Sequence, residues 1–492
     1  MRRLAVALLR WLAEALVRLY YPRRSVQGAG YLPPGGPALF VANHPNGLLD
    51  PLVLRVVIGR PVRFLAKSTL WGNPFGRLAM DAFQCLPVYR QQDAGQDAGQ
   101  DIGQDIGTKG SLGEQPAGVA APPARSRFVQ RNEETFARCR AELAAGAELA
   151  LYPEGTSHSD PALKPLKSGA ARIALSAAAQ AGASGMRNGT TTTTTTTTTT
   201  GGAPIPMPVV VPVGTHYDDK VVFRSGVHLV IGPSIDLDDH LRKFEANQKE
   251  GIESLTADIR ARLNELVLQA ETRELLAGIA RVASWTAADA DDDSPQRRHA
   301  RTHELLAAYR HLKARDPARL EQVAETARRY ARTLEQLGVR DPWALEAPRV
   351  SPGSVLVSLV KTVVMLPAAS WGALTSWVPY RLSGLLSARL TRDEDVLSTI
   401  KMIVGFTVLV ATWLAEAGFV GWRWGAGWGA ATLLFAPLAG YAALRLGETL
   451  HEVAEAVRHL GWRRRGATVH HLAERRRRLA DEVAGALREA SR

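Results

Sequence analysis

The stretch "FVANHPNGLLDPLVL", residues 40–54, joins two apolar runs through a turn that contains a histidine and is followed by an aspartate. His44 and Asp50 lie six positions apart, so on one continuous helix their side chains would point about 240° away from each other. Pro45 and Gly47 are residues that a sharp turn uses, which predicts that the chain bends at HPNG before a helix begins. Such a bend lets Asp50 hold one imidazole nitrogen while the other can accept a proton. A structural histidine that caps a helix is the alternative that this stretch alone leaves open.

Around this turn, residues 30–235 alternate between β-type and helical patterns. The predicted strands are 37–42, 62–66, 83–89, 147–152, 208–214 and 227–232, and predicted helices include 130–145 and 168–182. Alternation of this kind favours an α/β fold, with a mostly parallel or mixed sheet flanked by helices.

Three further motifs follow or form strands of the same region. They are "FQCLPVYR" (83–90), "LYPEG" (151–155) and "MPVVVPV" (207–213). With the Asn-His…Asp motif, they occur in the order found in the glycerolipid acyltransferase family, which includes glycerol-3-phosphate and 1-acylglycerol-3-phosphate acyltransferases. The chain resembles the branch of that family with the longer His-to-Asp spacing. It departs from the usual pattern at Gln84 (usually Gly), Tyr152 (usually Phe) and Ser157 (often Arg).

The resemblance implies roles for particular residues. His44 would be the general base that deprotonates the acceptor hydroxyl, Asp50 would orient it, and Arg90 would bind the acceptor's phosphate. The other implied substrate-binding residues are Lys67 and Lys167 as further phosphate ligands, Glu154 and Gly155 in the acceptor pocket, and Pro212 beside the acyl or thioester group. The donor would be acyl-CoA or acyl-carrier protein, with no metal or other cofactor.

A cluster of polar residues in "GTSHSD" (155–160) suggests a serine hydrolase at first sight. A Ser-His-Asp triad is assembled from separate loops, and neighbours in one short segment do not usually reach one another in line. No Gly-x-Ser-x-Gly motif occurs either, so we reject a serine nucleophile.

The C-terminal half turns apolar from residue 351, and we assign 351–447 to membrane segments. Segments 402–422 and 424–444 reach the length of about 20 residues that a helix needs to cross a bilayer, which predicts a spanning hairpin. Segment 362–380 contains two prolines and is expected to be re-entrant or interfacial. Basic residues flank the hairpin, and 448–492 forms a basic helical tail, so both ends are predicted to face the cytoplasm.

Residues 1–27 are predicted to form an amphipathic helix in the membrane interface. On a helix, Arg3, Arg10, Glu14 and Arg18 form one narrow charged stripe in an otherwise apolar surface. A helix packed on its own domain is the alternative. The acyltransferase domain would follow at 28–240, and a charged helical region at 241–350.

Composition limits the remaining possibilities. The net charge of +12 suits an anionic membrane or a phosphorylated substrate, and no nucleic-acid motif accompanies it. Two cysteines cannot make a disulfide framework. The Gln-Asp-Ala/Ile-Gly repeats at 92–107 and the eleven threonines at 190–200 cannot join a core, so we expect disordered insertions about 91–127 and 183–203.

The sequence therefore predicts a membrane enzyme on the cytoplasmic face of the inner membrane. It would acylate glycerol 3-phosphate, dihydroxyacetone phosphate or 1-acylglycerol 3-phosphate in phospholipid synthesis, with membrane lipids as its surroundings. A non-catalytic scaffold that retains an acyltransferase-like domain and an acyl-thioester hydrolase are the alternatives.

Overall fold

The computed structural model describes residues 2–89, 124–187, 206–287, 294–337, 352–391, 393–463 and 466–490. It divides into two compact units, Met1–Val267 and Leu268–Arg492. Arg90 and both low-complexity segments, 92–107 and 190–200, lie outside the described residues.

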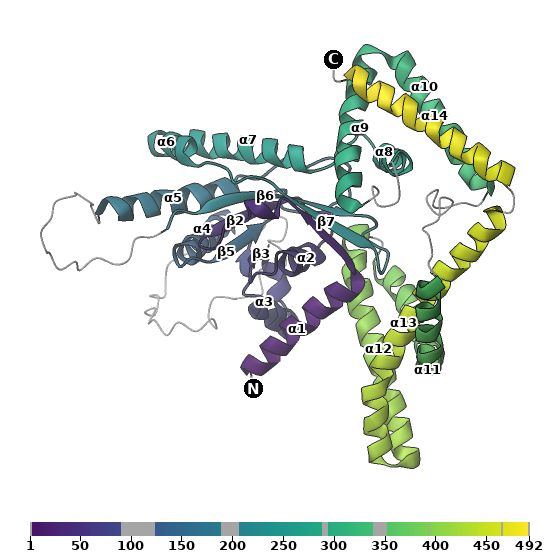
Figure 1. Ribbon diagram of the computed structural model, residues 1–492. Coiled ribbons are helices and arrows are strands. Elements are labelled where there is room, and N and C mark those ends of the chain that lie inside the picture. The colour runs from purple at the N-terminus through teal and green to yellow at the C-terminus, as the bar shows by residue number, and fades with distance from the viewer. Residues whose placement is uncertain are drawn as a thin grey trace, which may run out of the picture. The chain divides into compact units, whose positions relative to one another are not determined.

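The first unit contains a seven-stranded mixed sheet in the order β1-β7-β6-β2-β5-β3-β4 (Figure 1). The strands are β1 (Arg23–Gln27), β2 (Ala38–Ala42), β3 (Arg63–Lys67), β4 (Leu86–Val88), β5 (Glu148–Leu151), β6 (Val209–Tyr217) and β7 (Gly226–Ile231). Neighbouring strands are parallel except β6 and β7, which are antiparallel. The predicted fold class, a mixed sheet flanked by helices and followed by a helical region, is confirmed.

The helices cover both faces of the sheet (Figure 1). One face carries α4 (Ala124–Ala144), α5 (Gly169–Arg187), α6 (Asp238–Ala246) and α7 (Gln248–Leu266), and the other carries α1 (Arg2–Tyr20), α2 (Leu49–Ile58) and α3 (Pro74–Ala82). Two short 3₁₀ turns, η1 (Ala29–Tyr31) and η2 (Ser68–Trp71), complete the unit. Because helices cover both faces, the central strand β2 is buried at all five positions and reads as a continuous apolar run.

The parallel strands place the site. In β2, Phe40 lies opposite Ala150 of β5 and Val211 of β6. Strands β2, β5, β3 and β4 therefore end at the same edge of the sheet, and the segments that follow them converge there.

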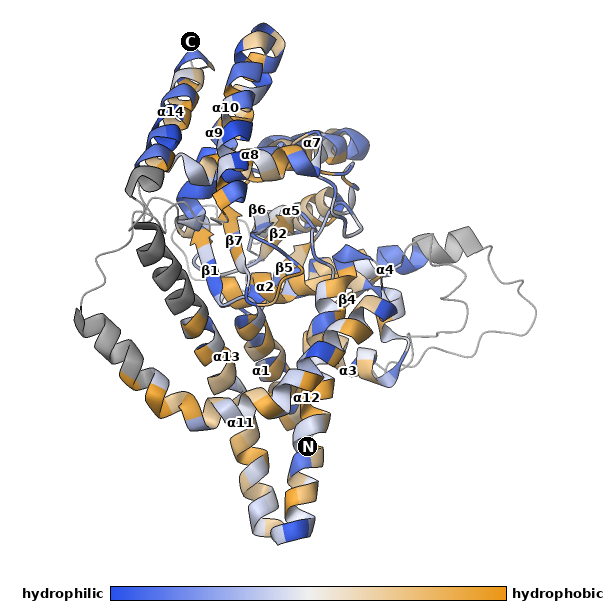
Figure 2. Cartoon of the chain, turned by 90° about the vertical axis from the view of Figure 1, so that its right-hand side faces the viewer, coloured by the Kyte–Doolittle hydropathy of each residue, from blue (hydrophilic) through white to orange (hydrophobic). Residues whose placement is uncertain are grey.

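The second unit is helical. It comprises α8 (Arg273–Trp285), α9 (Pro295–Arg315), α10 (Pro317–Leu337), α11 (Pro352–Leu390), α12 (Glu394–Trp424), α13 (Ala426–Arg463) and α14 (Gly466–Ala490). Apolar side chains of α8, α9, α10 and α14 form one core, which includes Tyr330 and Leu479. Apolar residues recur along α11–α13, whereas α10 and α14 are strongly hydrophilic (Figure 2).

Helices α12 and α13 form the predicted hairpin, with Gly425 between them at a φ of 102°. Within the described residues, two helical stretches, Glu394–Trp424 and Ala426–Leu450, are long and apolar enough to cross a membrane. Segment 362–380 lies inside the 39-residue helix α11, which contains Pro367 and Pro379.

Two element boundaries differ from the sequence-based ones. Strand β1 lies within 1–27, where only a helix was predicted, because Arg23–Gln27 pairs with β7 at the edge of the sheet. The first unit also extends past residue 240 to Val267, since α7 packs against α5 and β6.

Candidate active site

The site begins at the end of β2, where Asn43 anchors the chain. Its side-chain Oδ1 accepts a hydrogen bond from the Thr215 backbone N–H at 2.7 Å, and its Nδ2 donates to the Thr215 carbonyl at 3.0 Å. Asn43 thereby attaches the turn to β6 at the point where β2 stops.

His44 and Asp50 meet across the turn that follows. The chain bends at HPNG with Gly47 at a φ of 37°, and α2 begins at Leu49, so Asp50 lies in its first turn. His44 Nδ1 lies 2.8 Å from Asp50 Oδ2, which also accepts the backbone N–H of Asn46 at 2.7 Å. Asp50 is almost fully buried. The carboxylate therefore faces Nδ1 and leaves Nε2 as the imidazole's proton-accepting atom.

A tyrosine that sequence reasoning missed holds the other carboxylate oxygen. The hydroxyl of Tyr217, the last residue of β6, donates to Asp50 Oδ1 at 2.6 Å. Burial first, and the neighbouring Asp50 second, raise the pKa of Tyr217 well above its usual range. The phenol is therefore protonated, and a hydrogen-bond donor, near neutral pH.

A second tyrosine, Tyr152, stacks on the imidazole. The rings of Tyr152 and His44 lie 4.1 Å apart, centroid to centroid, at an interplanar angle of 14°. Burial, followed by Asp50, also raises the pKa of Tyr152 well above its usual range, so its ring stays neutral. The replacement of the usual Phe by Tyr at this position preserves an aromatic face for the histidine.

Glu154 joins two loops and does not line the cavity described below. Its Oε1 accepts the His44 backbone N–H at 3.0 Å, and its Oε2 accepts the Lys164 backbone N–H at 2.8 Å and contacts His158 Nε2. The His158 backbone N–H donates in turn to the His44 carbonyl at 3.1 Å. The buried Glu154 carboxylate thus fixes the backbone of His44.

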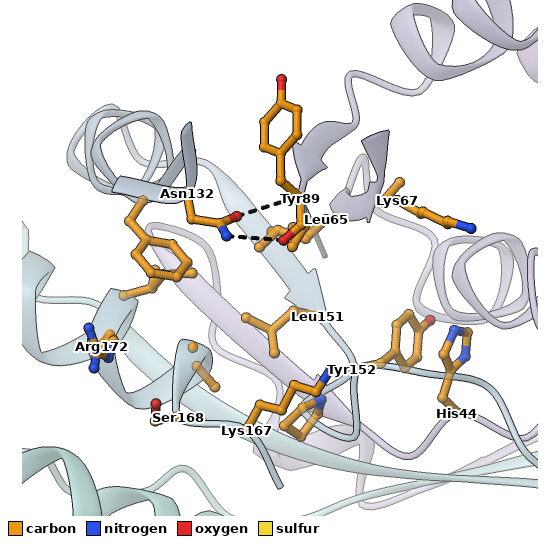
Figure 3. Close-up of a pocket in the computed structure, with 18 of the residues that line it drawn as sticks. His44, Leu65, Lys67, Tyr89, Asn132, Leu151, Tyr152, Lys167, Ser168 and Arg172 are labelled. Atoms are coloured by element: carbon orange, nitrogen blue, oxygen red, sulfur yellow. Dashed lines mark hydrogen bonds between the residues drawn. The ribbon is translucent and has the colours of Figure 1, made fainter. Parts of the chain in front are cut away.

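A cavity of about 530 Å³ opens in front of His44 (Figure 3). His44 and Tyr152 lie at one end, and Ser168 and Arg172 at the other. Its wall combines apolar side chains such as Phe136 with the cationic residues Lys67, Lys167 and Arg172.

Position 155 requires glycine, because the Lys167 side chain lies directly against its backbone. Its φ is +73°, and a Cβ there would lie 2.6 Å from Lys167 Nζ. The glycine permits a left-handed backbone and lets the lysine side chain cross it.

The structure gathers most of the predicted residues at one place. His44, Lys67, Gly155 and Lys167 line the cavity, with Asp50 directly behind the histidine. Pro212 does not line this cavity; it lies buried in β6, and its carbonyl accepts the Gly232 backbone N–H at 2.9 Å. Arg90 is outside the described residues, although the preceding Tyr89 lines the cavity and Asn132 of α4 pairs with both its backbone groups (Figure 3).

Arg172 was missed because it belongs to no motif, and only its place five residues after Lys167, in the first turn of a helix, could have indicated it. The serine-rich segment shows no hydrolase geometry, because His158 contacts Glu154 and Ser159 Oγ contacts Lys220 Nζ. In the described part of the chain, no group of three or more His, Cys, Asp or Glu residues is placed to hold a metal ion.

Residues 23–196 match the family model described as Acyltransferase. The chain contains an acyltransferase domain. An uncharacterised acyltransferase of Schizosaccharomyces pombe is 23% identical over 477 residues, covering 82% of this chain and 67% of that protein. The crystal structure of PlsC, the 1-acyl-sn-glycerophosphate (LPA) acyltransferase of Thermotoga maritima, aligns with a TM-score of 0.32 and 16% identity, covering 54% of this chain and 80% of that one. The match over residues 23–196 agrees with the acyltransferase family predicted from the four motifs.

Proposed function

We propose that this acyltransferase moves a fatty acyl group from a thioester, acyl-CoA or acyl-carrier protein, to a hydroxyl of a phosphorylated glycerol acceptor. Glycerol 3-phosphate, dihydroxyacetone phosphate and 1-acylglycerol 3-phosphate are the acceptors that fit. The observation that carries the proposal is the His44–Asp50 pair on the wall of a cavity that is also lined by Lys67, Lys167 and Arg172.

In the proposed reaction, His44 Nε2 takes the proton of the acceptor hydroxyl as its oxygen attacks the thioester carbonyl. Asp50 accepts the Nδ1–H hydrogen bond throughout and stabilises the imidazolium without taking its proton. When the tetrahedral intermediate collapses, the C–S bond breaks and the imidazolium returns the proton to the departing thiolate. The products are an ester and a free thiol, and His44 is again neutral.

The cationic residues of the cavity suit a phosphate ester. Arginine offers a planar fork of donors to phosphate oxygens, and lysine offers a compact point charge. Lys67 is the last residue of β3, Lys167 lies in the segment just before α5, and Arg172 lies in the first turn of α5, so the anion would be held from more than one side. We propose Arg90 as a further phosphate ligand. Pro212 is buried in β6 and does not line the cavity. We therefore propose that it affects the bound acyl or thioester group only indirectly, by shaping that strand.

Attachment to a membrane is part of the proposal. Helices α12 and α13 are long and apolar enough to cross a bilayer, and Arg463 and the arginines of α14 follow the hairpin. We propose that both ends of such a hairpin face the cytoplasm, at the inner membrane, because its flanks are basic. Substrates and products with acyl chains would then reside in the same membrane as the enzyme.

The test is to incubate membranes containing the chain with labelled acceptors and an acyl thioester, and to resolve the lipid products. Formation of 1-acylglycerol 3-phosphate from glycerol 3-phosphate, or of phosphatidate from 1-acylglycerol 3-phosphate, supports the proposal and identifies the acceptor. Thiol release without any acylated acceptor would contradict it and indicate a thioester hydrolase.

A further inference from the structure

Tyr217 lies outside residues 23–196, the range that the family model matches, yet it contacts the proposed catalytic pair. In the register of β6, Val213 is paired with Ala42, the last residue of β2, so β6 continues four residues past the end of its neighbour. The Asn43–Thr215 hydrogen bonds fix this extension. Tyr217, two residues further along the strand, is thereby delivered beside the HPNG turn.

The Asp50 carboxylate has three donors from three parts of the fold. His44 Nδ1 and the Asn46 backbone N–H face Oδ2, and the Tyr217 hydroxyl faces Oδ1. Tyr21 supports this arrangement, because its ring packs against Tyr217 at 5.1 Å and its hydroxyl accepts Asn46 Nδ2 at 2.8 Å.

The ionisable groups near Asp50 come from several elements. His44 and Asp50 belong to the turn and α2, Tyr217 to β6, and Tyr152 follows β5. Tyr21 follows α1, and Lys220 reaches the carbonyl of Pro45 at 2.8 Å from the loop after β6.

We propose that Tyr217 is a positioning residue of this site, whose hydroxyl fixes Asp50 and disperses its negative charge. A carboxylate that shares its charge with a phenol attracts the imidazolium less strongly than one without that donor. Tyr217 therefore limits how tightly His44 retains a proton and holds Asp50 in the orientation that fixes the imidazole. The predicted effect on turnover rests on the proposed function, but the effect on the titration of His44 does not.

The test compares the full chain with its Tyr217→Phe variant. We expect the titration midpoint of the His44 imidazole, followed by NMR with ¹³C-labelled histidine, to move to higher pH. Because the freed carboxylate orients the imidazole less well, kcat should fall by roughly 10-fold or more, with the acidic limb of kcat/KM displaced in the same direction as the midpoint. The matched control is Tyr20→Phe, which removes a nearby hydroxyl that donates to the Val221 carbonyl at 3.0 Å and does not contact Asp50.

A second substitution guards against simple misfolding. 3-Fluorotyrosine at position 217 preserves the ring and donates more strongly, so the His44 midpoint should move to lower pH. An unmoved midpoint in both Tyr217 variants, or an equal shift in Tyr20→Phe, would overturn the proposal, as would a fall in kcat with no shift of the midpoint. Absence of acyl transfer by the unaltered chain would contradict the proposed function instead, and the titration would still decide the role of Tyr217.

Discussion

His44 and Asp50 meet because the chain reverses between β2 and α2, and the backbone N–H of Asn46 fixes the carboxylate that faces the imidazole. Pro45 and Gly47 supply this bend locally. The groups that hold the pair in place, however, come from distant segments: Tyr217 from β6 and Glu154 from the segment after β5. The relative placement of His44 and Asp50 therefore depends on the folded sheet as well as on the local turn.

Burial is the largest influence on the pKa of both thiols, which makes a residue-level prediction possible. Burial raises the pKa of Cys85 and of Cys139 from 9.0 to about 12. The folded chain should therefore resist alkylation of both thiols near neutral pH. Below pH 9 the thiols are protonated in both the folded and the unfolded chain. Between pH 9 and 12 only the unfolded chain loses these protons. The free energy of unfolding should fall across that window by up to about 1.4 kcal/mol per thiol for each pH unit.

Denaturation of the detergent-solubilised chain at a series of alkaline pH values measures this slope. A Cys85→Ala/Cys139→Ala variant serves as the comparison, since only the slope and not the absolute stability is at issue. An equally steep slope in that variant would contradict the prediction that the two thiols cause this loss of stability.

At the scale of elements, α1 turns part of its charged stripe toward the domain. Arg10 Nε donates to the Ala82 carbonyl of α3, and Glu14 accepts Arg55 Nε of α2 at 3.0 Å. Leu4, Leu8 and Trp11 are instead exposed, at 76%, 60% and 63%. A helix held by polar contacts, with apolar side chains facing outward, has the character of an interfacial element.

This predicts that Leu8 contacts lipid in the reconstituted full chain. A fluorescent label on a Leu8→Cys variant should be quenched by brominated lipids. Labelling is made selective by placing this substitution in the Cys85→Ala/Cys139→Ala background, because Cys85 is only partly buried. The matched control is Lys249→Cys on α7, an exposed position on the opposite face of the sheet. Equal quenching at both positions would refute an interfacial role for α1.

Some elements were predictable and others were not, for physical reasons. The strands with apolar periodicity and the motif residues at their ends were found, because burial and turn chemistry are local signals. Strand β1 was missed since "RRSVQ" contains one apolar residue, and only pairing with β7 makes it a strand. The Tyr217–Asp50 contact joins residues 167 positions apart, and no local sequence pattern indicates it.

At the scale of the whole molecule, the likeness to the fission-yeast protein extends beyond the acyltransferase domain. It covers 82% of the chain, whereas the first unit ends at Val267 of 492 residues, so it includes part of the helical unit. An acyltransferase domain joined to apolar helices would suit the proposed reaction, in which the products stay in a bilayer. The net charge of +12 would favour the phosphorylated substrates and the anionic membrane that we propose.

The proposed reaction depends on proton transfer by His44, and its most direct test is acceptor-dependent thiol release by a His44→Ala variant. General base catalysis is worth about 10²–10⁴ in rate, so release should fall by that factor while the thermal unfolding midpoint stays close to that of the parent. His240→Ala is the matched control, because His240 bonds Ser254 and Asp258 and does not line the cavity. Undiminished acceptor-dependent release by the folded His44→Ala variant would contradict the assignment.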